Sequence, residues 1–327
     1  MSKNENEDLL GDSKMNISVI VPVYNSENSL RELYQRIKDV MESIANEYEI
    51  IMINDGSTDA SWDIITDLAD QAKTLKGINL MRNYGQHNAL LLGIRLACYE
   101  IVITIDDDLQ NPPEEIPKLV DKLKEGYDVA YGAPQKDQHG FWRNIASQVT
   151  KLVLKGTMGV QIARNVSSFR AFRSSVRDAF ADYRGSFVSI DVLLTWGTAC
   201  FTSIPVRHER RREGMSNYTL RKLLTHALNM VTGFSTMPLR LASVIGFGFS
   251  LFGFGVLFYV LARYLIQGSS VPGFPFLAAV ISIFSGVQLF SLGIIGEYLA
   301  RIHYGSMSRP YCVIRNKVGS FFDNSKN

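Results

Sequence analysis

Two long apolar runs near the carboxyl-terminal end most constrain how this chain can fold. Residues 241–262 and 274–296 are each long enough to cross a hydrocarbon core of about 30 Å. Arg263 is the one charged side chain between residues 241 and 296. Two such runs in tandem favour a membrane hairpin over a pair of buried core helices. The net charge of +2 therefore averages a charged soluble region and an uncharged membrane region.

Basic residues flank this hairpin on its outer sides, whereas the linker at 267–273 has no charge. They are Arg221, Lys222 and Arg240 before it, and Arg301, Arg309, Arg315 and Lys317 after it. The positive-inside rule predicts a multi-pass protein of the cell inner (cytoplasmic) membrane, with its soluble region and both termini cytoplasmic. The first 15 residues are polar, unlike a signal peptide, and are expected to be a disordered tail. Three cysteines without disulfide or zinc spacing suit a reducing compartment.

Apolar segments alternate with amphipathic ones over the first 131 residues. Strands are predicted at 17–23, 49–53, 78–81, 101–105 and 128–131. Helices are predicted at 29–47, from an N-cap at Asp59 to residue 75, at 86–97, and at 114–125 after Pro113. Because the strands are continuously apolar, the pattern indicates an α/β fold with a mostly parallel sheet covered on both faces. Ligands of such sheets bind at the carboxyl ends of the strands.

Polar clusters follow three of these strands, at residues 22–27, 54–59 and 106–110. The consecutive acids Asp106, Asp107 and Asp108 repel one another and are costly to hold at an apolar strand end. A Mg²⁺ or Mn²⁺ ion removes that cost and also binds phosphate oxygens. An acid after the second strand suits a ribose or a base. These features predict a metal-dependent site for a nucleoside diphosphate. The sequence has no P-loop, which argues against an ATPase, and no Gly-x-Gly-x-x-Gly string after the first strand, which argues against a dinucleotide enzyme.

Past residue 140 the pattern is less regular. Residues 141–154 and 216–234 are amphipathic and basic. They are either ordinary surface helices or helices that lie on the membrane interface.

The strings VIVPVYNSENSL, IIMINDGSTD, LMRNYGQHNALLLG and TIDDDLQNPPEEIPKLV resemble family 2 glycosyltransferases of the GT-A fold. The resemblance spans roughly residues 16–310 and is strongest to the polyprenyl-phosphate branch, which includes dolichyl-phosphate mannose synthases, bactoprenol glucosyltransferases and undecaprenyl-phosphate aminoarabinose transferases. It implies a Rossmann-like GT-A domain at 16–215, an amphipathic juxtamembrane helix at 216–238, two transmembrane helices at 239–298 and a cytoplasmic tail at 299–327. It also implies a homo-oligomer, such as a tetramer.

The same resemblance implies roles for individual residues. Asp106 and Asp108, with Gln110, would hold the metal. The nucleotide-sugar would contact Pro22, Tyr24, Asn25, Glu27, Asp55, Arg82, Gln86 and Asp107, although the middle acid is usually a small residue in this family. An Arg-x-x-Gly-x-Ser string implies that Arg211, as a catalytic residue, and Ser216 lie near phosphate. Asn217 stands where the family usually has a basic residue, and either Arg210 or Arg212 could compensate. Residues 133–139 lack the arginines of the family pattern, which leaves Lys136 and Arg143 as the cations there for the acceptor phosphate.

The resemblance implies an enzyme that transfers a sugar, with inversion, from a nucleotide-sugar to undecaprenyl phosphate in cell-envelope biogenesis. A UDP-linked donor, a Mg²⁺ or Mn²⁺ cofactor, the lipid bilayer and no nucleic acid are expected as partners. Two alternatives are a processive polysaccharide synthase and a catalytically silent membrane scaffold. A processive synthase typically has more membrane spans and a Gln-x-x-Arg-Trp motif, whereas this sequence has two predicted spans and no such motif. A silent scaffold would have no reason to keep Asp55, Asp106 and Asp108.

Overall fold

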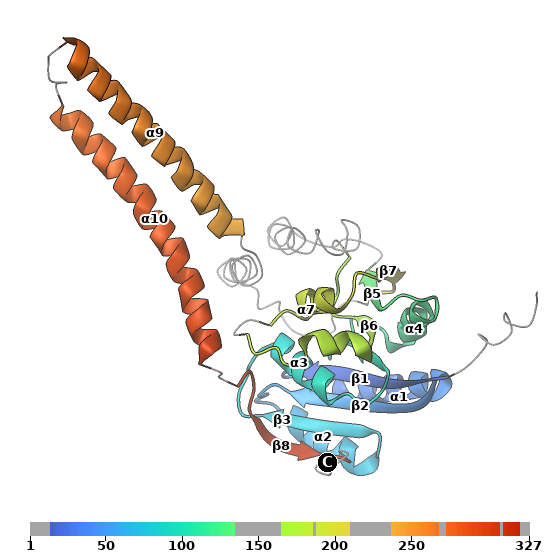
Figure 1. Cartoon of the computed structure of the whole chain (residues 1–327). Coiled ribbons are helices and arrows are strands. Elements are labelled where there is room, and N and C mark those ends of the chain that lie inside the picture. The colour runs from blue at the N-terminus through green and yellow to red at the C-terminus, as the bar shows by residue number, and fades with distance from the viewer. Residues whose placement is uncertain are drawn as a thin grey trace, which may run out of the picture. The chain divides into compact units, whose positions relative to one another are not determined.

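The computed structural model describes residues 14–134, 165–185, 188–209, 237–267, 273–307 and 310–320. The chain divides into two compact units (Figure 1). The catalytic unit comprises Met1–Tyr218 and Pro310–Asn327, and the hairpin unit comprises Thr219–Arg309. The chain therefore leaves the catalytic unit, forms the hairpin and returns to the catalytic unit.

The catalytic unit is built on an eight-stranded sheet in the order β7-β5-β6-β4-β1-β2-β3-β8. Neighbouring strands are parallel except where β6 pairs with β4 and β5, and where β8 pairs with β3. The strands are β1 (Met15–Val23), β2 (Ala45–Asn54), β3 (Leu75–Leu80), β4 (Ile101–Thr104), β5 (Val129–Pro134), β6 (Arg170–Arg173), β7 (Phe201–Val206) and β8 (Ile314–Val318). A mostly parallel sheet was predicted and is confirmed.

Helices cover both faces of this sheet because its strands are buried on both sides. On one face Val19 and Val21 of β1 pack in a core with α1 (Leu30–Ile44), α2 (Ser61–Gln71) and α4 (Ile116–Lys124). On the other face Ile20 of β1 contacts α3 (Gln86–Leu96), which packs against α7 (Ile190–Gly197). This alternation of side chains along β1 is the strand period of two.

The predicted strands and helices of residues 17–131 are present, with ends shifted by a few residues. Asp59 is not the N-cap of α2; that position is Ala60, and Asp59 Oδ1 accepts a hydrogen bond from Ser61 N at 3.0 Å. Pro113 begins a 3₁₀ turn, η1 (Pro113–Glu115), rather than α4 itself. A second 3₁₀ segment, η2 (Ser174–Phe180), follows β6.

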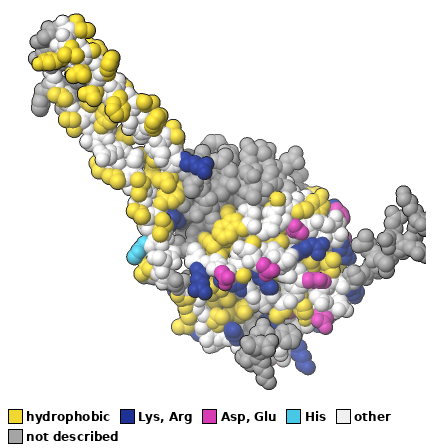
Figure 2. Space-filling model, viewed as in Figure 1, with side chains coloured by type: hydrophobic (Ala, Val, Ile, Leu, Met, Phe, Trp, Pro, Cys, Tyr) yellow, Lys and Arg dark blue, Asp and Glu magenta, His cyan; other side chains and the backbone are white. Residues whose placement is uncertain are grey.

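The hairpin unit consists of α9 (Met237–Gln267) and α10 (Phe274–Ser306), which begin or end beyond the predicted spans. Two stretches are long and apolar enough to cross a membrane: Pro238–Ile266, with a mean hydropathy of 2.2, and Ile283–Ser306, with 1.4. The Phe284 ring lies against Phe249 and Phe252, with centroids 5.9 and 6.4 Å apart. Figure 2 shows hydrophobic side chains over the visible surface of both helices.

The carboxyl-terminal end differs from the predicted tail at 299–327. The first part of that range continues α10, and β8 adds an antiparallel strand to the edge of the catalytic sheet. Arg315, Asn316 and Lys317 of β8 are exposed, so the segment lacks the apolar alternation by which a strand is recognised. Of the predicted tail at 1–15, Met15 instead begins β1. Residues 1–13 and the amphipathic segments at 141–154 and 216–234 lie outside the described residues.

Candidate active site

The candidate site lies at the carboxyl ends of β1 and β4. These strands are neighbours in the sheet. The chain leaves β1 toward β2 on one side, and β4 leads toward strands on the other side. Such a switch point opens a crevice between the two loops, which is where open α/β sheets bind ligands.

The Asp107 side chain joins the two loops of this switch point. Its Oδ2 accepts hydrogen bonds from Tyr24 N at 2.9 Å and Ser26 Oγ at 2.5 Å, and Ser29 Oγ donates to its carbonyl at 2.6 Å. Burial raises the pKa of Asp107 to about 6, against the effect of the Ser26 and Tyr24 hydrogen bonds. The carboxylate therefore ties the loop after β4 to the loop after β1, and its contact with a nucleotide-sugar stays a prediction.

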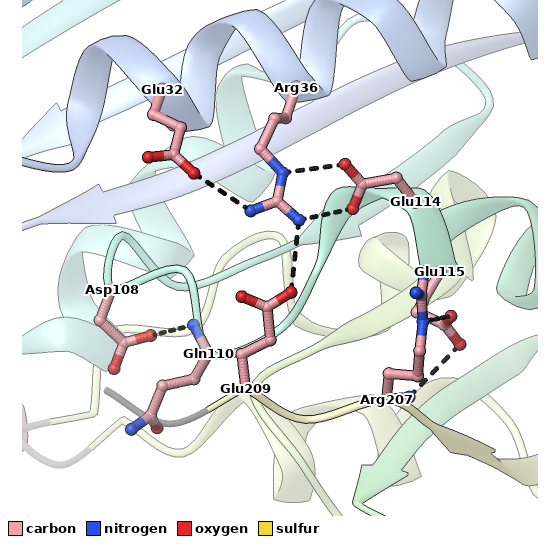
Figure 3. A network of polar contacts seen from close by, with 8 residues as sticks. All are labelled: Glu32, Arg36, Asp108, Gln110, Glu114, Glu115, Arg207 and Glu209. Carbon is pink, nitrogen blue, oxygen red and sulfur yellow. Dashed lines mark hydrogen bonds and ion pairs between the residues drawn. The ribbon is translucent and has the colours of Figure 1, made fainter. Parts of the chain in front are cut away.

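Asp106 and Asp108 point to other partners. Asp106 Oδ1 accepts a hydrogen bond from Gln86 Nε2 at 2.6 Å, and its Oδ2 accepts one from Ser168 Oγ. Asp108 Oδ1 accepts a hydrogen bond from Gln110 N at 3.1 Å (Figure 3). Between them Leu109 has a φ of 60°, so the loop turns sharply just after the acids. The three side chains thus have different hydrogen-bond partners among the described residues.

Within the described parts of the chain, no group of three His, Cys, Asp or Glu side chains is placed to hold a metal ion. Mg²⁺ is usually bound through one or two protein carboxylates, and substrate phosphates and waters complete its shell. A carboxylate has about four lone-pair sites, so an oxygen that accepts one hydrogen bond can also bind a cation. Asp106 and Asp108 carry the oxygen ligands that such a site requires, and their role as metal ligands stays a prediction.

The loop after β2 packs directly on the loop after β3. Asp55 is buried, and its two oxygens accept hydrogen bonds from Tyr84 N at 2.7 Å and Gly85 N at 2.8 Å. Burial raises its pKa, although these two hydrogen bonds act in the opposite direction. Gly56 has a φ of 69°, and a Cβ there would lie 2.6 Å from the Arg82 carbonyl carbon. Glycine is therefore required where the two backbones meet, and Asp55 fixes the start of α3.

Hydrogen bonds also join the loop after β1 to the loop after β2. Asn25 Oδ1 accepts a hydrogen bond from Thr58 N, and Glu27 Oε2 accepts one from Ala60 N, each at 2.8 Å. Tyr24 is about half exposed, and the Arg82 guanidinium lies 4.8 Å from the centroid of the Tyr84 ring. Pro22 is in β1, paired with β2. The fold thus brings together the four loops that carry the predicted donor and metal residues.

Sequence reasoning missed an ion-pair network beside these loops (Figure 3). Arg36 of α1 makes a two-pronged contact with Glu114, at 2.8 and 2.7 Å, and its Nη2 lies 3.7 Å from Glu209 Oε1. Arg207 Nε donates to Glu115 Oε1 at 2.8 Å. Burial alone would raise the pKa of Glu115, but hydrogen bonds from Lys118 and Arg207 lower it. The repeated acids of the Asn-Pro-Pro-Glu-Glu string were the available signal.

This network holds the chain after β7 against the acidic loop. Glu209 N donates to the Gln110 carbonyl at 2.8 Å, and His208 Nδ1 lies 3.4 Å from Asn111 Oδ1. The predicted phosphate-binding residues lie outside the described part of the chain; they are Lys136, Arg143, Arg211 and Ser216.

Comparisons with known proteins show the family of this chain. The model of the family described as glycosyl transferase family 2 matches residues 18–183, a range that includes all four site loops. The chain belongs to glycosyl transferase family 2. A family 2 enzyme with the GT-A fold was predicted, and both are confirmed.

Relatives of this glycosyltransferase match it over nearly its whole length. One is the undecaprenyl-phosphate 4-deoxy-4-formamido-L-arabinose transferase of Edwardsiella ictaluri, 36% identical over 92% of this chain and 94% of that protein. The protein of the same name from Pseudomonas aeruginosa is also 36% identical, over 92% of this chain and 90% of its own length. These matches extend well beyond residues 18–183.

Solved structures show the same fold. A glucosyl-3-phosphoglycerate synthase from Mycobacterium tuberculosis, in complex with Mn²⁺, UDP and glucosyl-3-phosphoglycerate, superposes with a TM-score of 0.50. The match covers 67% of this glycosyltransferase and 78% of that chain, at 18% sequence identity. At this level of identity the likeness concerns the fold alone.

Proposed function

We propose that this glycosyltransferase moves a sugar from a nucleotide-sugar to the phosphate of undecaprenyl phosphate, for modification of a cell-envelope glycan or lipid. The match that carries the proposal is to transferases named for undecaprenyl phosphate, which align with 92% of the chain. That range is too long to exclude the hairpin, so the likeness includes the membrane segment as well as the catalytic unit. A uridine nucleotide is the expected carrier of the sugar.

The donor binds in the crevice between the loops after β1 and β4. Pro22, Tyr24, Asn25 and Glu27 line one side of it. Asp55, Arg82 and Gln86 belong to the loops after β2 and β3, and Asp107 joins the loop after β4 to the loop after β1. Asp55 acts mainly by holding the start of α3.

Asp106 and Asp108, with Gln110, would hold a Mg²⁺ or Mn²⁺ ion. Such an ion stabilises the charge that develops on the departing nucleoside diphosphate. The protein holds Asp106 with Gln86 and Ser168, so that carboxylate is oriented before the donor binds. Pre-oriented groups do not have to reorganise during the reaction.

The acceptor needs little activation. A phosphate monoester has a second pKa of about 6 and is largely dianionic at neutral pH, so it attacks the anomeric carbon without a general base. Attack opposite the leaving group inverts the configuration of that carbon.

Arg211 acts on the leaving or attacking phosphate, and Ser216, Lys136 and Arg143 bind the acceptor phosphate. Glu209, two residues before Arg211, is bonded to Gln110 of the acidic loop, which supports the proposal for Arg211.

The hairpin anchors the enzyme in the inner membrane with two spans, and the catalytic unit is cytoplasmic. Two observations support this orientation: the basic residues lie outside the hairpin in sequence, and β8 returns to the sheet that precedes the hairpin. A lipid acceptor then meets the catalytic unit at the membrane surface, which supplies proximity. The enzyme is proposed to act as a homo-oligomer.

The test is transfer of labelled sugar into lipid. Purified full-length protein is mixed with undecaprenyl phosphate, Mn²⁺ or Mg²⁺, and a panel of UDP- and GDP-sugars that includes 4-deoxy-4-formamido-L-arabinose as its UDP derivative. We expect label in organic-extractable lipid from one donor, and its loss when EDTA removes the metal.

A single sugar on each lipid would support the proposal. A long polymer would instead identify a processive synthase, and label that persists in EDTA would contradict the role of the metal. No label from any donor, with Mn²⁺ binding also absent, would favour a silent scaffold.

A further inference from the structure

Ser168 lies opposite Asp106 because of the register of the sheet. β6 is antiparallel to β4, with Thr104 opposite Arg170 and Ile103 opposite Ala171. Continuing this register two residues past the end of β4 sets Asp106 opposite Ser168. The contact between the Ser168 hydroxyl and Asp106 Oδ2 agrees with that position. Ser168 and Asp106 are 62 residues apart in the sequence, so the pairing of β4 with β6 brings them together.

Two side chains, those of Thr104 and Arg170, hold the backbone carbonyl of Ser168. Its carbonyl accepts a hydrogen bond from Thr104 Oγ1 at 2.6 Å and a longer one from Arg170 Nε at 3.4 Å. Arg170 Nε also donates to Thr104 Oγ1 at 3.1 Å. Ser168, Thr104 and Arg170 therefore form a closed set of contacts, and the Ser168 side chain links this set to Asp106.

Arg170 is itself fixed by an ion pair inside the protein. Its side chain is 1% exposed, and its Nη1 contacts Asp191 Oδ1. Tyr131 OH donates to the same Asp191 oxygen at 3.2 Å. Asp191 lies in the first turn of α7. A buried guanidinium without its carboxylate is strongly unfavourable, so this pair defines one arrangement of α7, β5 and β6.

We propose that Ser168 is a positioning residue of the cation site. Its hydroxyl holds one oxygen of Asp106 while Gln86 holds the other, and the buried Arg170–Asp191 pair acts through Ser168 by fixing its backbone. The inference deepens the proposed function, because it rests on the assignment of Asp106 as a metal ligand. Groups that orient a metal ligand typically contribute ten- to a hundred-fold to metal affinity.

The experiment measures Mn²⁺ binding directly, by the loss of the free-ion electron paramagnetic resonance signal. Purified full-length protein is titrated with Mn²⁺, alone and with UDP present. We expect Ser168→Ala to weaken Mn²⁺ affinity by about ten- to a hundred-fold, and Ser168→Thr, which keeps the hydroxyl, to restore most of it. The unfolding midpoint of each variant is measured in the same buffer to confirm that the fold is retained.

Ser167→Ala is the matched control. The Ser167 hydroxyl accepts a hydrogen bond from Phe169 N at 3.2 Å, so the substitution removes a hydroxyl from the same segment without touching Asp106. Its Mn²⁺ affinity is expected to equal that of the wild type.

A double-mutant cycle tests the second half of the inference. Asp191→Asn removes the charge that balances Arg170. If the pair acts through Ser168, the double variant Asp191→Asn/Ser168→Ala binds Mn²⁺ no more weakly than Ser168→Ala alone. Additive losses would show that the ion pair acts independently. If Asp191→Asn does not fold, Ser168→Ala against Ser168→Thr still decides the role of the hydroxyl.

Two failures are distinguishable. Absence of Mn²⁺ binding by the wild type in the presence of UDP would overturn the proposed cation site itself. Wild-type binding that Ser168→Ala leaves unchanged would overturn the positioning role of Ser168 and leave the proposed function intact.

Discussion

Glu49 in β2 and Asp106 in the loop after β4 are acidic residues with contrasting surroundings. Glu49 of β2 is 3% exposed; its Oε1 accepts hydrogen bonds from Ser18 Oγ and Cys98 N, each at 2.6 Å. Its Oε2 lies 2.5 Å from Lys76 Nζ, and the Lys76 side chain is 5% exposed. The charge of Glu49 is thus balanced by a cation buried with it.

The acids after β4 are held in another way. Asp106 accepts from the amide of Gln86 and the hydroxyl of Ser168, and Asp107 from a backbone N–H and the hydroxyl of Ser26. Each of these four donors is a neutral group. The comparison teaches that the groups facing an acid indicate its role. An acid that faces a buried cation is part of the scaffold, whereas successive acids oriented by neutral donors at strand ends suit a cation from outside.

Removing Glu49 gives the largest effect on stability. Glu49→Ala leaves Lys76 buried without its counter-charge, so we expect the free energy of unfolding to fall by about 3–5 kcal/mol, measured by denaturant titration of the purified protein. The double variant Glu49→Leu/Lys76→Met removes both charges and should recover most of this loss. If Glu49→Ala were as stable as the wild type, Glu49 would not be a scaffold residue, and its contrast with Asp106 would no longer hold.

Removing Asp108 affects catalysis instead. Asp108→Ala is expected to reduce sugar transfer by about a hundred- to a thousand-fold while the protein still inserts into membranes and unfolds at the wild-type midpoint. The measurement is the initial rate of label transfer to lipid. Asp121→Ala, which removes an exposed acid of α4, is the control and should keep the wild-type rate. Normal transfer by Asp108→Ala would rule out its role as a metal ligand.

The smallest effect is expected at an exposed ion pair. Arg31 and Asp67 are 2.6 Å apart, but their side chains are 57% and 46% exposed. Water solvates both charges, and such pairs contribute little to stability. Arg31→Ala should therefore leave the unfolding midpoint unchanged within error, in contrast with Glu49→Ala. A drop comparable to that of Glu49→Ala would show that burial is not what separates the two pairs.

Much of the catalytic unit could be predicted because its early strands are continuously apolar. The strand that contains Val19 and Val21 must be buried on both faces, and this requires helices on each side. The acids at 106–108 were recognisable as a candidate site because three adjacent carboxylates repel one another, whatever the rest of the fold.

Other elements carried no such signal. β6 has four residues and two arginines, one of them the buried Arg170, so its sequence resembles an exposed segment. β8 exposes its polar side chains and is a strand because its backbone pairs with β3. In both cases the hydrogen bonds of a neighbouring strand, not local preference, determine the structure.

The sequence by itself determined the apolar hairpin, the alternating strands and helices, and the acidic loops at strand ends. These follow from hydrophobicity and charge repulsion, which act between residues close together in the chain. Only the tertiary structure decided that Asp107 joins two loops, that Asp55 holds the start of α3, that Ser168 faces Asp106, and that the chain returns from the hairpin to complete the sheet. Each of those depends on strand order and register, which bring together residues far apart in sequence.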